Sequence, residues 1–192
     1  MTLHIDKKSY ENSLFIHIPK TAGSSIFMAL KNSKVFDWTD KDLKKHYAYR
    51  DANFLLGFIP EDIFKFTVVR NPFTRAYSYY KHFNKINNTN FKFKDFLNIV
   101  DHKKNYNKTP LIAFTQSYFI FDNGINQMNK TYRFENLKEL ENDFKISLPH
   151  WNVGEYNIKD SMLEFNDEII NKIIDIYEED FINFGYSTEF RR

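Results

Sequence analysis

The sequence predicts an α/β protein built on a mostly parallel sheet. Two stretches, residues 13–33 and 64–83, each indicate a buried strand that runs through a tight turn into a helix. Strands that alternate with helices favour a layered structure with parallel strands. The chain has 192 residues, 42% of them hydrophobic, which is enough for one sizeable core. We therefore expect a single domain over residues 1–192, with residues 1–12 as a flexible N-terminus.

The first stretch begins with SLFIHI, residues 13–18, a short apolar run typical of a buried strand. PKTAG follows as a turn, and SSIFMALKNS, residues 24–33, has the apolar spacing of a helix. The spacing predicts that Ile26, Phe27 and Leu30 face the core. Ser24 or Ser25 is the expected helix cap.

The second stretch contains FKFTVVR, residues 64–70, the strongest predicted strand in the chain because it is rich in Val and Phe. Asn71 and Pro72 follow at once, and these residues suit the cap and the first position of a helix. The helix is predicted to run through residue 83. Its expected core-facing side chains are Phe73, Ala76, Tyr77, Tyr80 and Phe83.

The remaining segments carry weaker signals. Residues 39–49 predict a helix, and the Asn- and Lys-rich residues 87–110 predict a surface excursion around one short helix. Residues 131–137 predict a strand that ends where a helix through LKELENDF begins. Residues 148–157 predict a loop.

The last predicted helix has the clearest pattern. Asn166 can cap it, and Asp167 and Glu168 lie in its first turn, where the helix dipole favours acidic residues. Gly185 is placed to end it. Apolar side chains recur at helical spacing in between: Ile169, Ile170, Ile173, Ile174, Tyr177, Phe181 and Phe184.

Composition excludes several classes of site. The formal net charge of +2 gives no support for a nucleic-acid-binding surface, so any anion site must be local. The chain has no cysteine, which excludes disulfides and thiolate zinc sites, and its six histidines form no metal-like pair at helical spacing. The N-terminus has no apolar signal-peptide region, and no segment has the length of a membrane span. We expect a soluble, cytoplasmic protein.

The first turn has the features of a phosphate-binding loop. The first backbone N–H groups of a helix have no partner inside it, and the helix dipole adds partial positive charge there. Lys20 supplies a full charge, and Gly23 allows close approach of the backbone. Hydroxyl groups come from Thr21, Ser24 and Ser25. Because lysine precedes the glycine, the loop differs from the nucleotide-triphosphatase pattern. It remains possible at this stage that the turn only joins a strand to a helix.

The second turn offers another anion site. Arg70 ends the strand, and Ser78 lies eight residues later, about 12 Å along the helix axis. Helical side chains lean toward the N-terminus, so Arg70 and Ser78 could reach one anionic group. The forked donors of arginine suit phosphate. In the alternative, Arg70 pairs with a carboxylate and Ser78 is only a small helix residue. Arg75 is expected to be a partner in a structural ion pair rather than a ligand residue.

Two anion sites imply a ligand with two separated anionic groups, such as a nucleotide that carries groups at both its 5′ and 3′ positions. The segments also resemble the sulfotransferase family, and most closely its carbohydrate branch, which includes the heparan and chondroitin/dermatan sulfotransferases. PKTAGSS, residues 19–25, resembles the 5′-phosphosulfate loop, and RNPFTRAYSYY, residues 70–80, resembles the 3′-phosphate motif. Further resemblance follows in order through KKHYAYRDANFLLG, YRFENLKELENDF, LPHWN and YEEDFINFGY.

This resemblance implies a P-loop-like three-layer α/β fold, with a central mostly parallel sheet flanked by helices. It also implies transfer of a sulfuryl group from 3′-phosphoadenosine 5′-phosphosulfate to a hydroxyl group, expected on a glycan, without a metal. Arg70 and Ser78 would hold the 3′-phosphate. The residues that would surround the 5′-phosphosulfate are Lys20, Thr21, Ala22, Gly23, Ser24 and Ser25.

Sulfuryl transfer needs charge stabilisation and a base. Lys20 is expected to neutralise charge on the leaving oxygen. His46 occupies the family's histidine position and is the candidate base; the alternative is a surface histidine on a lysine-rich helix. Two other functions remain open, a nucleotide-dependent kinase on a related fold and a non-catalytic nucleotide-binding module. Against the kinase, the chain lacks a lysine at the expected position and an obvious Mg²⁺-binding Asp. A non-catalytic module would not need His46.

Overall fold

The computed structural model describes residues 13–32, 63–105, 107, 109–149 and 164–190. The chain divides into two compact units, each made of two segments: residues 1–69 with 118–152, and residues 70–117 with 153–192. We describe each unit by itself. The expectation of one domain over residues 1–192 stays a prediction.

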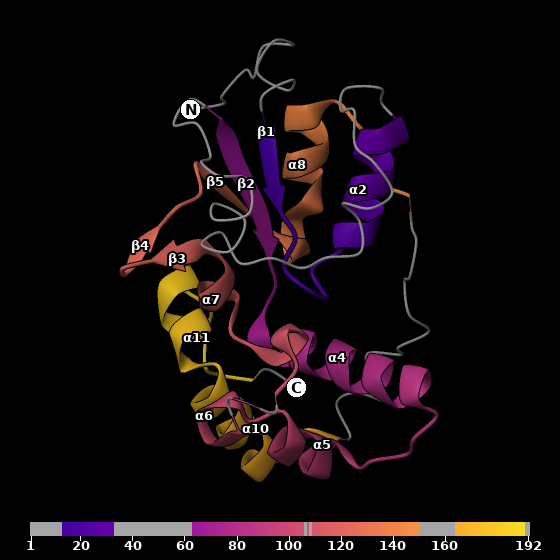
Figure 1. The fold of residues 1–192 in the computed structure, drawn as a ribbon, viewed down its shortest axis with the longest axis vertical. Helices are drawn as coiled ribbons and strands as arrows, with labels where there is room; N and C mark the ends of the chain where they lie inside the picture. The colour runs from indigo at the N-terminus through magenta and orange to yellow at the C-terminus, as the bar shows by residue number, and fades with distance from the viewer. Residues whose placement is uncertain (1–12, 33–62, 106, 108, 150–163, 191–192) are drawn as a thin grey trace. The chain divides into compact units, whose positions relative to one another are not determined.

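The first unit contains a parallel three-stranded sheet. Its strands are β1 (Ser13–Ile16), β2 (Phe64–Val69) and β5 (Lys130–Arg133), in the order β1-β2-β5 (Figure 1). Both predicted strands near residues 13 and 64 are confirmed. All three strands run the same way, so their carboxyl ends lie at one edge of the sheet. Both faces of β2 are buried, which is the burial expected for a central strand of a parallel sheet.

Two helices cover one face of this sheet. They are α2 (Gly23–Asn32) and α8 (Leu137–Phe144), and both predicted helices are confirmed. Both contribute to one buried cluster with the strands (Figure 1). A polar link joins β5 to α8, because Lys130 Nζ and the Tyr132 hydroxyl both donate to Asp143 Oδ2, at 2.6 and 2.8 Å. The buried members of the cluster are Phe15, Ile26, Leu30, Phe66, Val68, Tyr132, Leu140 and Phe144.

The short segments around β5 differ from the prediction. A 3₁₀ turn, η4 (Phe134–Asn136), separates β5 from α8. The segment before β5 contains helix α7 (Gln116–Ile120) and a hairpin of β3 (Phe121–Asp122) and β4 (Ile125–Asn126). Its turn residues Asn123 and Gly124 have φ of 49° and 77°. Asn-Gly is the preferred pair for such a turn, so the sequence itself contains a local hairpin signal here.

The second unit is helical and has an aromatic core. Helix α4 (Pro72–Asn87) supplies one side, and its predicted cap is confirmed: Asn71 Oδ1 accepts from Phe73 N–H at 2.9 Å, and Pro72 is the first helical residue. The other helices are α5 (Phe93–Ile99), α6 (His102–Asn105), α10 (Asp167–Ile176) and α11 (Glu178–Phe184), with a 3₁₀ turn η3 (Leu111–Ala113) (Figure 1). Ring pairs such as Phe73 with Phe181, 5.0 Å between centroids, fill the interior.

Two predictions about this unit are wrong. Residues 87–110 are not a surface excursion, because Phe93, Phe96, Leu97 and Val100 are buried in the core. These apolar residues recur at helical spacing among lysines and asparagines, whose number misled us. The last helix is also interrupted, at Tyr177, where φ of −113° and ψ of 26° end α10 before α11 begins.

Both ends of that segment agree with the prediction. The Asn166 side chain accepts from Ile169 N–H at 2.9 Å, and Gly185 ends α11 in the left-handed region. The predicted helix over residues 39–49, the N-terminal residues 1–12 and most of the loop over residues 148–157 lie outside the described residues.

Candidate functional site

The turn between β1 and α2 has an alternating backbone. Lys20 and Ala22 have φ of 70° and 68°, whereas Thr21 and Gly23 have no positive φ. Residues that alternate between left- and right-handed conformations aim successive N–H groups into one concavity, which is a common anion-binding arrangement. A positive φ costs a residue with a Cβ about 1–2 kcal/mol. Two such residues in one turn mark it as a strained segment of the backbone.

The first turn of α2 is suited to an anion. Its first intrahelical bond runs from Ile26 N–H to Ala22 O at 3.1 Å, so the N–H groups of Gly23, Ser24 and Ser25 precede the helical ladder. No acidic residue lies in this turn, whereas α10 and α11 both begin with acidic residues. The predicted cap was wrong, because the helix begins at Gly23 and both serines lie inside its first turn.

The side chains of the turn divide into two groups. Thr21 is fully buried, and its hydroxyl donates to Ile18 O at 2.8 Å. It therefore holds the shape of the turn, and only its backbone N–H remains for an anion. Ser24 is exposed, Ser25 is buried, and Lys20 is partly exposed. Lys20 and Ser24 are thus the turn's polar side chains with the most solvent access.

The His17 side chain packs so closely against Gly23 that it leaves no space for a Cβ at residue 23. A Cβ placed on Gly23 would lie 1.8 Å from both Cδ2 and Nε2 of His17. The His17 ring stacks on Phe15 with centroids 5.8 Å apart and fills the space beside the glycine. The sequence suggested that Gly23 serves the ligand; in the structure, the close approach is made by His17.

We expect Gly23→Ala to lower the free energy of unfolding by about 1–2 kcal/mol, because the His17 ring must swing out of the space that the new methyl group takes. Chemical denaturation would measure it. The double variant His17→Ala/Gly23→Ala should lose no more than His17→Ala alone. As a control, Gly124→Asn should destabilise less, because no atom lies within 4 Å of a Cβ there and the remaining cost is that of a positive φ, which asparagine tolerates better than most residues. Equal stability of Gly23→Ala and wild type would contradict this packing.

Arg70 begins the second turn, between β2 and α4. Its backbone is held by the side-chain amide of Gln116: Arg70 N–H donates to Oε1 and Nε2 donates to Arg70 O, both at 2.8 Å. Its side chain runs along the first turn of α4, where Nε–H donates to Thr74 Oγ1 at 3.0 Å. Thr74 in turn donates to Asn71 O at 3.1 Å. Like α2, α4 has no acidic residue in its first turn.

Ser78 lies one helical turn beyond Thr74 on the same side of α4, since residues four apart share a face. It is buried, with 6% of its surface exposed. Thr74, which is exposed, lies between Arg70 and Ser78 on this face, and we had not singled it out. The spacing of four from residue 70 to 74 to 78 was a signal that could have identified it. That Arg70 and Ser78 share one anion stays a prediction.

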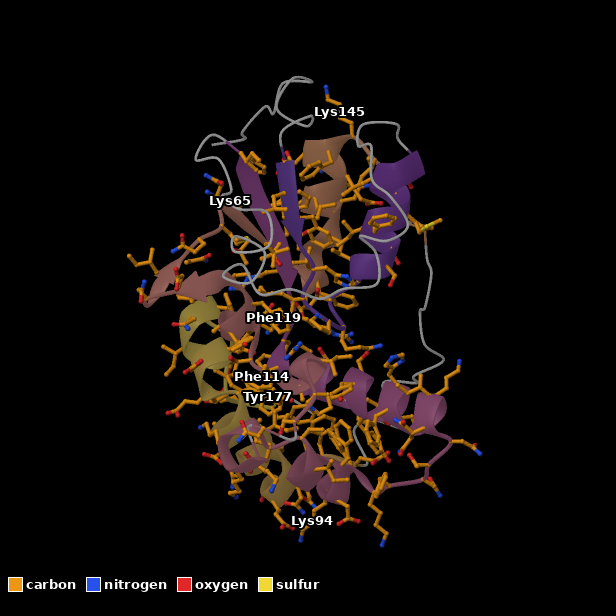
Figure 2. The ribbon with its side chains drawn as sticks, in the orientation of Figure 1. Lys65, Lys94, Phe114, Phe119, Lys145 and Tyr177 are labelled. Atoms are coloured by element: carbon orange, nitrogen blue, oxygen red, sulfur yellow. The ribbon has the colours of Figure 1, made fainter. Side chains whose placement is uncertain are left out.

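Arg75 has a structural role. It is 3% exposed, and its guanidinium donates to Phe114 O at 3.0 Å and Ile112 O at 3.2 Å. It lies 5.9 Å from the centre of the Tyr177 ring; Phe114 and Tyr177 are labelled in Figure 2. Burial lowers the pKa of Arg75, and nearby Tyr177 and Asp180 oppose that shift. Burial likewise raises the pKa of Asp180, against the charge of Arg75.

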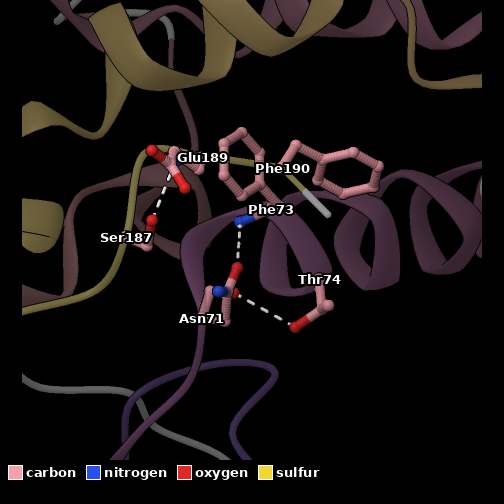
Figure 3. A pocket seen from close by; sticks show the side chains of 6 residues that line it. All are labelled: Asn71, Phe73, Thr74, Ser187, Glu189 and Phe190. Carbon is pink, nitrogen blue, oxygen red and sulfur yellow. Dashed lines mark hydrogen bonds between the residues drawn. The ribbon is translucent and has the colours of Figure 1, made fainter. Parts of the chain in front are cut away.

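A pocket of about 320 Å³ lies at the start of α4 (Figure 3). Asn71, Phe73 and Thr74 line one side, and the C-terminal segment supplies Ser187, Glu189 and Phe190. Ser187 Oγ accepts from Glu189 N–H at 3.0 Å. We do not assign this pocket to phosphate, because the Glu189 carboxylate disfavours an anion.

His46 lies outside the described residues, so the structure does not test it as a base. Within the part of the chain that is described, no group of three or more His, Asp or Glu side chains could hold a metal ion. None of the described helices is long and apolar enough to span a membrane.

Comparison with known protein families identifies the family to which the chain belongs. A family model described as "Sulfotransferase family" matches residues 4–187. The chain belongs to the sulfotransferase family. This membership and the parallel sheet with its flanking helices confirm the predicted P-loop-like α/β fold. Searches of curated proteins and of solved structures found no significant match. The chain is therefore a sulfuryl-transferring enzyme by family.

Proposed function

We propose that this sulfotransferase moves a sulfuryl group from 3′-phosphoadenosine 5′-phosphosulfate to a hydroxyl group of a carbohydrate. The observation that carries the proposal is the alternating backbone of residues 20–23 at the start of α2, in a member of this family. Such a turn suits a tetrahedral anion such as the phosphosulfate. Lys20, the first residue of this turn, adds the charge that a leaving phosphate oxygen needs.

The second anionic group of the donor is assigned to Arg70 and Ser78. Arg70 follows β2, whose carboxyl end lies at the same edge of the sheet as that of β1. Ligands of parallel α/β sheets bind outside that edge. Arginine recognises phosphate through paired donors, and α4 adds the positive end of its dipole. Thr74, which holds Arg70 Nε, is assigned a supporting role.

The bonds formed and broken in the proposed reaction balance. The acceptor oxygen forms a bond to sulfur, the bond between sulfur and the bridging oxygen breaks, and the acceptor proton passes to a base. Negative charge grows on the bridging oxygen, where Lys20 and the N–H groups of the turn act. His46 is proposed as the base because imidazole titrates near neutral pH.

Ligand preference tests the donor assignment. Thermal shift in EDTA should show stronger stabilisation by adenosine 3′,5′-bisphosphate than by ATP, because only the former carries the 3′-phosphate. Arg70→Ala should remove this preference, whereas Lys94→Ala, at an exposed ion pair with Glu168, should not. Equal or better binding of ATP would refute the donor.

The acceptor needs its own experiment. Labelled donor, offered with oligosaccharides, small alcohols and tyrosine peptides, should transfer label to the oligosaccharides. Label on another class alone would refute the carbohydrate assignment and leave the donor assignment intact. Binding of the bisphosphate without transfer to any acceptor would favour a non-catalytic module.

A further inference from the structure

We infer that Gln116 is a positioning residue for Arg70 and that, through it, Asp180 supports recognition of the 3′-phosphate. This inference rests on the proposed function, because it assigns Gln116 to the donor site through Arg70. The side-chain amide of Gln116 bonds both the N–H and the carbonyl of Arg70, each at 2.8 Å. We refer to this pair of hydrogen bonds as the Gln116 clasp.

Arg70 lies at the junction between a strand and a helix. β2 ends at Val69, and α4 begins at Pro72 after its cap Asn71. The clasp bonds both the N–H and the carbonyl of Arg70, in the way a neighbouring strand would. Because the backbone sets the direction of the Cα–Cβ bond, the clasp restricts the positions that the guanidinium can reach, and Thr74 then holds Nε.

Gln116 is itself held rigidly. It is fully buried, and its backbone N–H donates to Asp180 Oδ2 at 2.8 Å. The next residue, Ser117, donates its N–H and its hydroxyl to Asp180 Oδ1 at 2.9 and 3.0 Å. Asp180 is fully buried on α11 and lies near the charge of Arg75. One carboxylate thus fixes the segment that carries the clasp.

In this arrangement, the structural role and the positioning role belong to different groups. Asp180 and Ser117 hold the position of residue 116, and the Gln116 side chain bonds the backbone of Arg70. If Gln116 had a purely structural role, its replacement would lower stability and weaken the binding of all ligands alike. If it has a positioning role, its replacement weakens the binding of ligands that carry a 3′-phosphate more than the binding of those that do not.

The test compares adenosine 3′,5′-bisphosphate with adenosine 5′-monophosphate by titration calorimetry. Wild type should prefer the bisphosphate, and Arg70→Ala should lose that preference. Gln116→Met keeps the length of the side chain and removes the clasp. We expect it to reduce the preference about tenfold, through weaker binding of the bisphosphate alone. In turnover, it should raise KM for the donor more than it lowers kcat.

Gln127→Met is the matched control. It makes the same substitution at a glutamine whose side-chain amide donates to Ile125 O and belongs to no part of the clasp, so the preference should remain. If Gln116→Met folds and keeps the wild-type preference while Arg70→Ala loses it, the inference is overturned. If wild type itself shows no preference, the assignment of Arg70 in the proposed function fails instead.

Should Gln116→Met fail to fold, wild-type NMR decides the question. The Arg70 backbone amide and the Gln116 side-chain amide should shift on addition of the bisphosphate and not with the monophosphate. Identical responses to the two nucleotides would overturn the inference.

Discussion

Replacing Lys20 with methionine is expected to lower kcat/KM for sulfuryl transfer by about 10²- to 10³-fold, the range for loss of one group that stabilises developing charge. Lys20 lies in the strained turn before α2, with φ of 70°. Methionine keeps the length of the side chain and removes its charge. Steady-state transfer from labelled donor, with stability checked by denaturation, would measure the effect.

Lys145 provides a matched control for this variant. It is also a lysine with positive φ, 49°, and lies exposed at the end of α8 in the same unit (Figure 2). Lys145→Met should leave transfer unchanged, because charge alone at a left-handed residue confers no function. If Lys20→Met retains wild-type kcat/KM, the role of this lysine in stabilising the leaving oxygen is wrong.

Replacing Arg75 with methionine is expected to lower the free energy of unfolding by about 3–5 kcal/mol, the cost of breaking a buried charged network by removing one partner. The change leaves the carbonyls of Phe114 and Ile112 without their guanidinium donor. It also leaves the buried Asp180 without the nearby positive charge. Denaturant unfolding followed by circular dichroism would measure the loss.

Two further variants show whether burial and charge explain the effect. Lys94→Met removes an exposed cation 2.6 Å from Glu168 and should change stability much less (Figure 2). The double variant Arg75→Met/Asp180→Asn should lose less than the sum of its single variants, because it removes both charges together. Strict additivity would show that Arg75 and Asp180 do not interact.

Local sequence signals were sufficient for most elements. The Val- and Phe-rich run of β2 and the Asn71–Pro72 start of α4 each depend on neighbouring residues, and both were predicted correctly. The same holds for the Asn166 cap and the Gly185 end of the last segment. The burial of residues 93–100 was missed, because their composition is polar overall and only their spacing identifies a core-facing side.

Features of the candidate site that depend on side-chain contacts could not be predicted. The space beside Gly23 is filled by the His17 ring, and the backbone of Arg70 is bonded by Gln116, which lies 46 residues away in sequence. No spacing rule connects such pairs. The left-handed conformations of Lys20 and Ala22 were equally hidden, since neither residue type favours them.

By itself, the sequence determined which residue types follow the two strands and are proposed to meet an anion: a lysine and hydroxyls after one strand, and an arginine after another. These choices depend on local propensity and on the strand–turn–helix order. Only the tertiary structure decided how the residues are held, through the strained turn at residues 20–22, the His17 ring and the Gln116 clasp. The physical reason is that backbone direction at a turn is set by packing and hydrogen bonding in the folded chain, such as the Gln116 clasp, which outweigh the weak preferences of the turn's own residues.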